Sequence, residues 1–198
     1  MGDPFAHIRA GFFLGFRHRR ELRQLLAATP EMRHILTLSP AALLGDGVAA
    51  IALDFDGVLA HHGASTPLPE AIEWMECCRD VFGEDKMFIL SNKPTEERRI
   101  WFREHFPNAR FIAAVRKKPY PDGLLAVAEL AGVPPHSLLM IDDRLLTGCL
   151  AAVVAGVRPV YIRHPFISFG QRPFSELFFI MLRSLERLFV RASSRCCH

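Results

Sequence analysis

The chain has 198 residues, half of them hydrophobic, and a formal net charge of +3. This length and composition exclude disorder throughout and allow a substantial core. The charge is uneven: residues 1–33 hold six arginines against three acidic residues, residues 171–198 hold five against two, and the middle is acidic. Both ends are therefore expected to suit an anionic surface, and sequence-specific nucleic-acid binding is not expected.

From residue 48 onward, short apolar strands alternate with helical patterns. Strands are predicted at 49–56, 86–92, 109–115, 136–142 and 157–163, and helices at 69–82, 94–106, 122–132 and 144–156. This alternation predicts an α/β fold with a doubly wound parallel sheet and helices on both faces. The rhythm divides the chain into a basic N-terminal helical segment (1–45), the α/β core (46–165) and a basic amphipathic C-terminal helix (166–198).

Polar residues lie at or just after the carboxyl ends of four successive predicted strands. They are Asp54 and Asp56, Ser91 and Asn92, Lys117 and Lys118, and Asp142 and Asp143. Each pair alone has a plain explanation as a turn, a helix cap or a solvated charge. In parallel sheets, however, ligands bind outside the carboxyl ends of the strands. The polar residues at these four strand ends therefore predict a single ligand-binding site.

The motifs at these strand ends resemble those of the haloacid dehalogenase superfamily of phosphohydrolases. They read DFDGV (54–58), LSN (90–92), KKP (117–119) and IDDR (141–144), and the resemblance spans residues 48–162. It implies a Rossmann-like core and phosphate ester hydrolysis through an aspartyl-phosphate. Asp54 is then the expected nucleophile and Asp56 the general acid.

The resemblance also assigns the remaining strand-end residues. Ser91 is expected to donate to the phosphoryl group, and Lys118 to neutralise charge, with Lys117 as the alternative lysine. Substrate contacts are expected from Gly57, Asn92 and Lys117. His61 and His62, which follow the first motif, are expected to have no catalytic role.

Mg²⁺ is the implied cofactor, because it is a hard cation that prefers oxygen ligands. The expected ligands are Asp54, the backbone carbonyl of Asp56, and Asp143, with Asp142 beside them. Relatives commonly carry Gly-Asp and, several residues later, a second Asp; here Asp142 stands at the glycine position and Gly148 at the later aspartate. Either Asp142 replaces the missing carboxylate, or the chain is a catalytically weak binding module.

The intervals between the motifs are short, 28 residues from Gly57 to Lys86 and 24 from Asn92 to Lys117. No cap domain is therefore expected, and an open site suits a large substrate. The segments SNK, DRLLTG and LTLSPAALLGDGV resemble the phosphatidylglycerophosphate phosphatase branch, although DFDGV departs from its Asp-x-Asp-Asn-Thr. A phospholipid substrate is expected; the alternative is a soluble phosphatase for a small metabolite or nucleotide.

The C-terminal helix carries an apolar stripe: Phe174, Phe178, Met181, Leu182, Leu185, Leu188 and Phe189. A basic amphipathic helix can lie in a membrane interface, and it can equally pack its stripe onto the core. No segment is predicted to span a membrane, and the cysteines show no CxxC spacing. A cytoplasmic location is expected, with peripheral attachment to the membrane if the helix lies in a membrane interface. The chemistry is expected to need only residues between 54 and 143.

Overall fold

The computed structural model describes residues 6–92, 95–112, 116–170 and 172–192. Within these residues, five strands form one parallel sheet in the order β3-β2-β1-β4-β5. The strands are β1 (Ala50–Leu53), β2 (Met87–Ile89), β3 (Arg110–Phe111), β4 (Leu138–Asp142) and β5 (Arg158–Tyr161). The predicted α/β class with a parallel sheet is confirmed.

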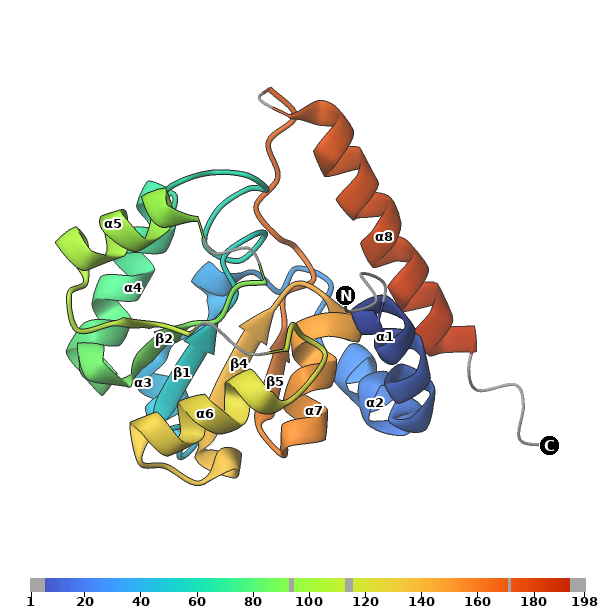
Figure 1. Cartoon of the computed structure of the whole chain (residues 1–198), viewed down its shortest axis with the longest axis horizontal. Coiled ribbons are helices and arrows are strands. Elements are labelled where there is room, and N and C mark those ends of the chain that lie inside the picture. Colours follow the sequence, from blue (N-terminus) through green and yellow to red (C-terminus); the bar gives the residue numbers. More distant parts are fainter. Residues whose placement is uncertain (1–5, 93–94, 113–115, 171, 193–198) are drawn as a thin grey trace.

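Helices flank both faces of this sheet (Figure 1). In the predicted core they are α4 (Pro69–Phe82), α5 (Glu96–His105), α6 (Asp122–Ala131) and α7 (Leu150–Ala155). Shorter elements are α3 (Pro40–Gly45), the 3₁₀ turns η1 (Ile35–Thr37), η2 (Glu84–Lys86) and η3 (Pro135–Ser137), and the π-helical turn η4 (Leu145–Cys149). The helix predicted at 144–156 thus begins as the π turn and continues as α7.

The strands are shorter than the apolar runs that predicted them. β1 ends at Leu53, three residues before the predicted end, and the chain then turns so that the Gly57 N–H donates to the Ala60 carbonyl (2.7 Å). β3 has two residues, and positions 113–115 of the predicted third strand lie outside the described residues. The early end of β1 places both motif aspartates in a loop at the sheet edge.

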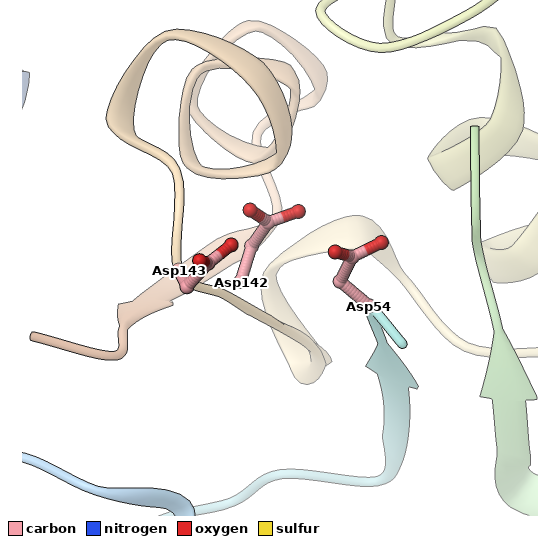
Figure 2. A group of neighbouring side chains, drawn as sticks. All are labelled: Asp54, Asp142 and Asp143. Carbon is pink, nitrogen blue, oxygen red and sulfur yellow. The ribbon is translucent and has the colours of Figure 1, made fainter. Parts of the chain in front are cut away.

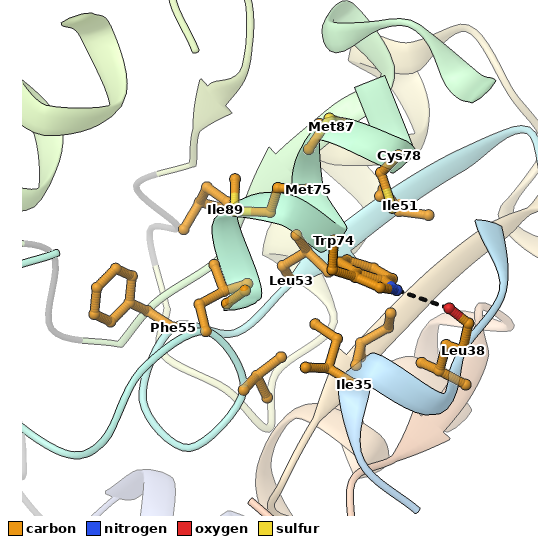
Figure 3. Packing of buried hydrophobic residues seen from close by; sticks show 14 of the residues in the cluster. Ile35, Leu38, Ile51, Leu53, Phe55, Trp74, Met75, Cys78, Met87 and Ile89 are labelled. Carbon is orange, nitrogen blue, oxygen red and sulfur yellow. Dashed lines mark hydrogen bonds between the residues drawn. The ribbon is translucent and has the colours of Figure 1, made fainter. Parts of the chain in front are cut away.

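Strand β1 is buried on both sides, which is typical of a central parallel strand. Ile51 and Leu53 belong to a cluster that includes Trp74 of α4, and Ala50 and Ala52 belong to the cluster formed with α6 and α7. Figure 3 shows the first cluster, where the Trp74 indole N–H donates to the Leu38 carbonyl (2.7 Å). The rigid centre of the sheet therefore supports the loop that follows β1.

The two ends of the chain pack together beside β5. The terminal helices are α1 (Ala6–Arg17), α2 (Arg19–Ala28) and α8 (Pro173–Ala192). Leu22 and Leu26 of α2, Tyr161 of β5 and Val190 of α8 share one buried cluster. Figure 1 shows α8 running past α1 and extending beyond the carboxyl edge of the sheet. No helix in the described part of the chain is long and apolar enough to cross a membrane.

Candidate active site

Three carboxylates meet at the carboxyl edge of the sheet (Figure 2). Asp54 directly follows β1, Asp142 ends β4, and Asp143 comes next. β1 and β4 are neighbours with Leu53 opposite Ile141, so their ends coincide. One oxygen of each carboxylate lies within 4.8 Å of the others. The pairing of two strands thus brings together residues almost ninety positions apart.

Lys118 bridges two of these carboxylates. Its Nζ donates to Asp54 Oδ1 (2.7 Å) and to Asp142 Oδ2 (2.6 Å), and the lysine is 4 % exposed. Asn92 positions this lysine, because its side-chain oxygen accepts from the Lys118 N–H (2.9 Å). Lys117, the alternative lysine, is exposed at the rim of the cavity described below. The buried cation beside Asp54 is therefore Lys118.

The crowded carboxylates have unusual proton affinities. Burial raises the pKa of Asp54 to about 7, opposed by the charge of Lys118 and reinforced by that of Asp142. Burial likewise raises the pKa of Asp143 to about 7, against the opposing charge of Arg183. The cluster thus concentrates negative charge that a divalent cation would neutralise.

The free oxygens of the cluster point to Asp143 as a direct ligand of such a cation. Asp143 Oδ2 accepts from Arg183, whereas Oδ1 is buried without a hydrogen-bond partner among the described residues. Both oxygens of Asp142 are already used, by Lys118 and by the Arg144 N–H (2.8 Å). The donor set of Asp54 and Asp143 fits a hard divalent cation, with Asp142 as their support.

Two glycines make room for these side chains. Gly57 has a φ of +83°, and a Cβ there would overlap with the carboxylate of Asp143. A Cβ on Gly148 would overlap with the carboxylate of Asp142. Asp142 therefore occupies the space beside Gly148, the position that the family resemblance aligns with the later aspartate. This geometry supports the alternative in which Asp142 replaces that carboxylate.

Asp56 is held by an arginine that the sequence analysis did not select. Arg98 of α5 donates to both Asp56 oxygens (2.7 and 3.1 Å), and the Gly63 N–H donates to Oδ1 (3.1 Å). Arg98 is 3 % exposed and stacks over the Phe55 ring, 3.8 Å from its centroid. Burial raises the pKa of Asp56, but the hydrogen bonds and charge of Arg98 outweigh burial and hold it below its ordinary value.

A second group of missed residues lies on the inner face of α8. Glu176, Arg183 and Glu186 are at most 4 % exposed and point toward the site rather than to water. Arg183 Nη1 donates to Asp143 Oδ2 (2.7 Å), and Glu186 accepts from the Arg144 side chain and from the Leu145 N–H (3.0 Å). Residues beyond position 143 therefore contact the site, and the expectation that the chemistry needs only residues 54–143 stays a prediction.

Glu176 anchors the beginning of α8 to the loop after β1. It accepts from the His62 N–H (3.1 Å), and the His62 ring stacks on Phe179 with centroids 3.6 Å apart. Burial lowers the pKa of His62 to about 4, so the ring is neutral at pH 7. The spacing of the charged residues, 176, 183 and 186, followed by Val190, is a heptad-like pattern that marks a buried face.

These elements enclose a cavity of about 820 Å³. Its polar lining includes Asp54, Asp56, Lys118, Asp143 and the predicted Ser91, which is 8 % exposed, and Asn92 and Lys117 also line it. Its apolar wall is formed by Phe12, Phe178, Phe179, Leu182 and Leu185, from α1 and α8. The cavity therefore offers both charged groups and a hydrocarbon surface.

A parallel sheet flanked by helices, with acidic residues and a lysine at its carboxyl edge, defines an α/β enzyme with a carboxylate-rich site. The family model for haloacid dehalogenase-like hydrolases matches residues 17–156. The chain belongs to this family of hydrolases, which generally use a divalent metal.

The structure is also similar to the crystal structure of an uncharacterized protein from Corynebacterium glutamicum ATCC 13032. The TM-score is 0.46 with 19 % identity, over 69 % of this chain and 96 % of that chain. No curated protein matches the chain.

Proposed function

We propose that the protein is a Mg²⁺-dependent phosphatase that hydrolyses a phospholipid monoester such as phosphatidylglycerophosphate. The observation that carries this proposal is the mixed polar and apolar lining of the cavity. Asp54 and Lys118 at the sheet edge line it together with Phe178, Leu182 and Leu185 of α8. A phosphate group would lie beside the charged residues, and the glycerol and acyl part of a lipid would lie against the apolar ones.

In the first step, a carboxylate oxygen of Asp54 attacks phosphorus while the ester P–O bond breaks, and Asp56 gives a proton to the leaving oxygen. In the second step, water attacks phosphorus of the aspartyl-phosphate and Asp56 takes its proton, which restores Asp54 and releases phosphate. In this proposal Lys118 and Ser91 stabilise the charge of the transferred group. A bound Mg²⁺, held by Asp54, Asp143 and the Asp56 carbonyl, would supply further positive charge to the phosphoryl oxygens.

Arg98 has different effects on these two steps. It favours the ionised form of Asp56, which the second step needs to accept a proton from water. The first step needs a protonated Asp56, and the ion pair with Arg98 disfavours this form.

A phosphate-release assay with Mg²⁺ tests the proposal. The substrates are phosphatidylglycerophosphate in mixed micelles and two soluble monoesters, glycerol 3-phosphate and a nucleoside monophosphate. The lipid should be hydrolysed most efficiently, and Asp54→Asn should release no phosphate from any substrate. Preference for a soluble ester would instead favour a metabolite phosphatase, and no release from any substrate would favour a catalytically weak binding module.

A further inference from the structure

Helix α8 has the opposite burial pattern to an ordinary surface helix. Its charged residues Glu176, Arg183 and Glu186 are buried against the site, while Leu177, Met181 and Leu188 are 53–62 % exposed. A surface helix normally turns its apolar stripe to the core. The alternative in which the stripe packs on the core is therefore wrong for most of its residues: Phe174, Phe178, Met181, Leu185 and Leu188 are exposed.

Helix α1 adds exposed aromatic side chains next to this stripe. Phe12, Phe13 and Phe16 are 49–71 % exposed, and the Phe12 ring contacts Phe189 of α8 with centroids 5.4 Å apart. The glycine face of α1 packs inward, since a Cβ on Gly15 would lie 2.7 Å from a Leu146 methyl. We call the exposed apolar side chains of the two helices the outer face: Phe12, Phe13, Phe16, Phe174, Leu177, Phe178, Met181, Leu185 and Leu188. An exposed apolar surface of this kind marks an interaction site.

The outer face continues into the catalytic cavity. Phe12, Phe178 and Leu185 are about half exposed and also line the cavity that contains Asp54. A molecule whose apolar part lies on the outer face can therefore place a polar group at the carboxylate cluster. This continuity favours an occupant that is also the source of the substrate.

The charges near the outer face favour an anionic occupant. Arg9 and Arg17 of α1 and Arg191 of α8 are exposed, and Arg172, which precedes α8, is exposed at the cavity. The two terminal segments that carry this face hold the basic excess of the chain, whereas its middle is acidic. Basic side chains beside apolar ones are typical of helices that lie in an anionic membrane interface.

We infer that the outer face of α1 and α8 docks on an anionic lipid surface, with the cavity mouth facing the lipid. This inference deepens the proposed function and rests on it for the identity of the substrate. Docking itself needs no turnover. The charged inner face of α8 stays in the site while its apolar face enters the interface.

Co-sedimentation with vesicles tests the docking. The probes are vesicles of phosphatidylcholine alone and of phosphatidylcholine with phosphatidylglycerol, at low and high salt. A variant with Phe13, Leu177, Met181 and Leu188 changed to Gln removes exposed side chains that do not line the cavity. The matched control changes Ile100, Leu125 and Leu130, which are 44–50 % exposed on α5 and α6, to Gln.

The wild-type protein should bind the anionic vesicles more tightly than the neutral ones, and high salt should weaken binding. The outer-face variant should bind at least about tenfold more weakly, because it loses apolar contact area, while the control binds like the wild type. Hydrolysis of a small soluble phosphate ester should be unchanged in both variants.

Vesicle binding by the outer-face variant at the wild-type level would overturn the inference. So would a wild-type protein that ignores vesicles and forms a dimer that the variant loses, because the occupant would then be a second copy. Vesicle binding through the outer face without phosphate release from any phospholipid would contradict the proposed function alone, and leave the docking inference supported.

Discussion

Arg183 of the C-terminal helix donates to Asp143, with 2.7 Å between Nη1 and Oδ2, and both side chains are at most 3 % exposed. This pair joins the last helix of the chain to the expected cation ligand at the end of β4. It neutralises one buried charge and leaves Asp143 Oδ1 without a partner in the described structure. The relationship makes α8 part of the site.

Arg183→Ala should lower the free energy of unfolding of the cation-free protein by roughly 3–5 kcal/mol, because it leaves a buried carboxylate unpaired. Urea unfolding measures this loss. Added Mg²⁺ should stabilise the variant more than the wild type, because the cation becomes the main counter-charge of Asp143. Ser184→Ala, an exposed neighbour on the same helix, is the control. Equal stabilisation of variant and wild type by Mg²⁺ would show that Arg183 does not face the cation site.

Asp143→Asn should weaken Mg²⁺ binding more than Asp142→Asn. Asp143 offers the free oxygen, whereas Asp142 acts through Lys118 and the Arg144 N–H. Loss of a supporting partner typically costs about 10–100-fold in metal affinity, so Asp142→Asn should fall within or below this range and Asp143→Asn above it. Calorimetric titration with Mg²⁺ measures both. The opposite order would make Asp142 the direct ligand.

Gly148→Asp alone should destabilise the protein, because even a Cβ at position 148 overlaps with the Asp142 carboxylate. Overpacking of this kind costs about 1–3 kcal/mol. The double variant Asp142→Gly, Gly148→Asp should recover stability, since it moves the carboxylate to the other side of the same space. Thermal unfolding of the two variants compares them. A double variant less stable than Gly148→Asp would mean that the two positions do not share that space.

His62 should make the protein sensitive to acid. Its pKa is about 4 in the folded protein, against 6.5 ordinarily, because burial and the charges of Arg183, Arg144 and Arg98 outweigh the attraction of Asp56. The unfolded chain then binds more protons between these values, so stability is present above pH 6.5 and is lost as pH falls toward 4. Each pKa unit is worth about 1.4 kcal/mol, so a difference of roughly 2.5 units corresponds to a loss on the order of 3 kcal/mol.

Thermal unfolding of His62→Gln across this range provides the test. Glutamine does not titrate, so the variant should lose less stability than the wild type between pH 6.5 and 4. His61→Gln, at the adjacent position, is the control. Parallel curves for His62→Gln and the wild type would place the acid-sensitive groups elsewhere.

The core fold and the acidic cluster could be predicted from local sequence. Apolar runs alternating with helical patterns specify parallel strands, and parallel strands deliver their carboxyl ends to one edge. Asp54 and Asp143 follow directly from that rule, because each lies at or next to the carboxyl end of a predicted strand. The sequence motif also predicts that a lysine belongs to the site. Only the packing, however, places Lys118 between Asp54 and Asp142 and leaves Lys117 exposed.

The partners of these groups were decided by tertiary structure. Arg98 and Arg183 each meet an aspartate about forty residues away, and neither lies next to a motif. The sequence of α8 did not determine its orientation either. Its periodicity defines an apolar face and a charged face, and the pattern is satisfied whichever of them turns toward the core. The buried carboxylate of Asp143 and the turn at Arg144 and Leu145 form hydrogen bonds with the charged face of α8. If this face pointed outward, only water would form hydrogen bonds with it. That pairing turns Arg183 and Glu186 inward and leaves the apolar stripe outside.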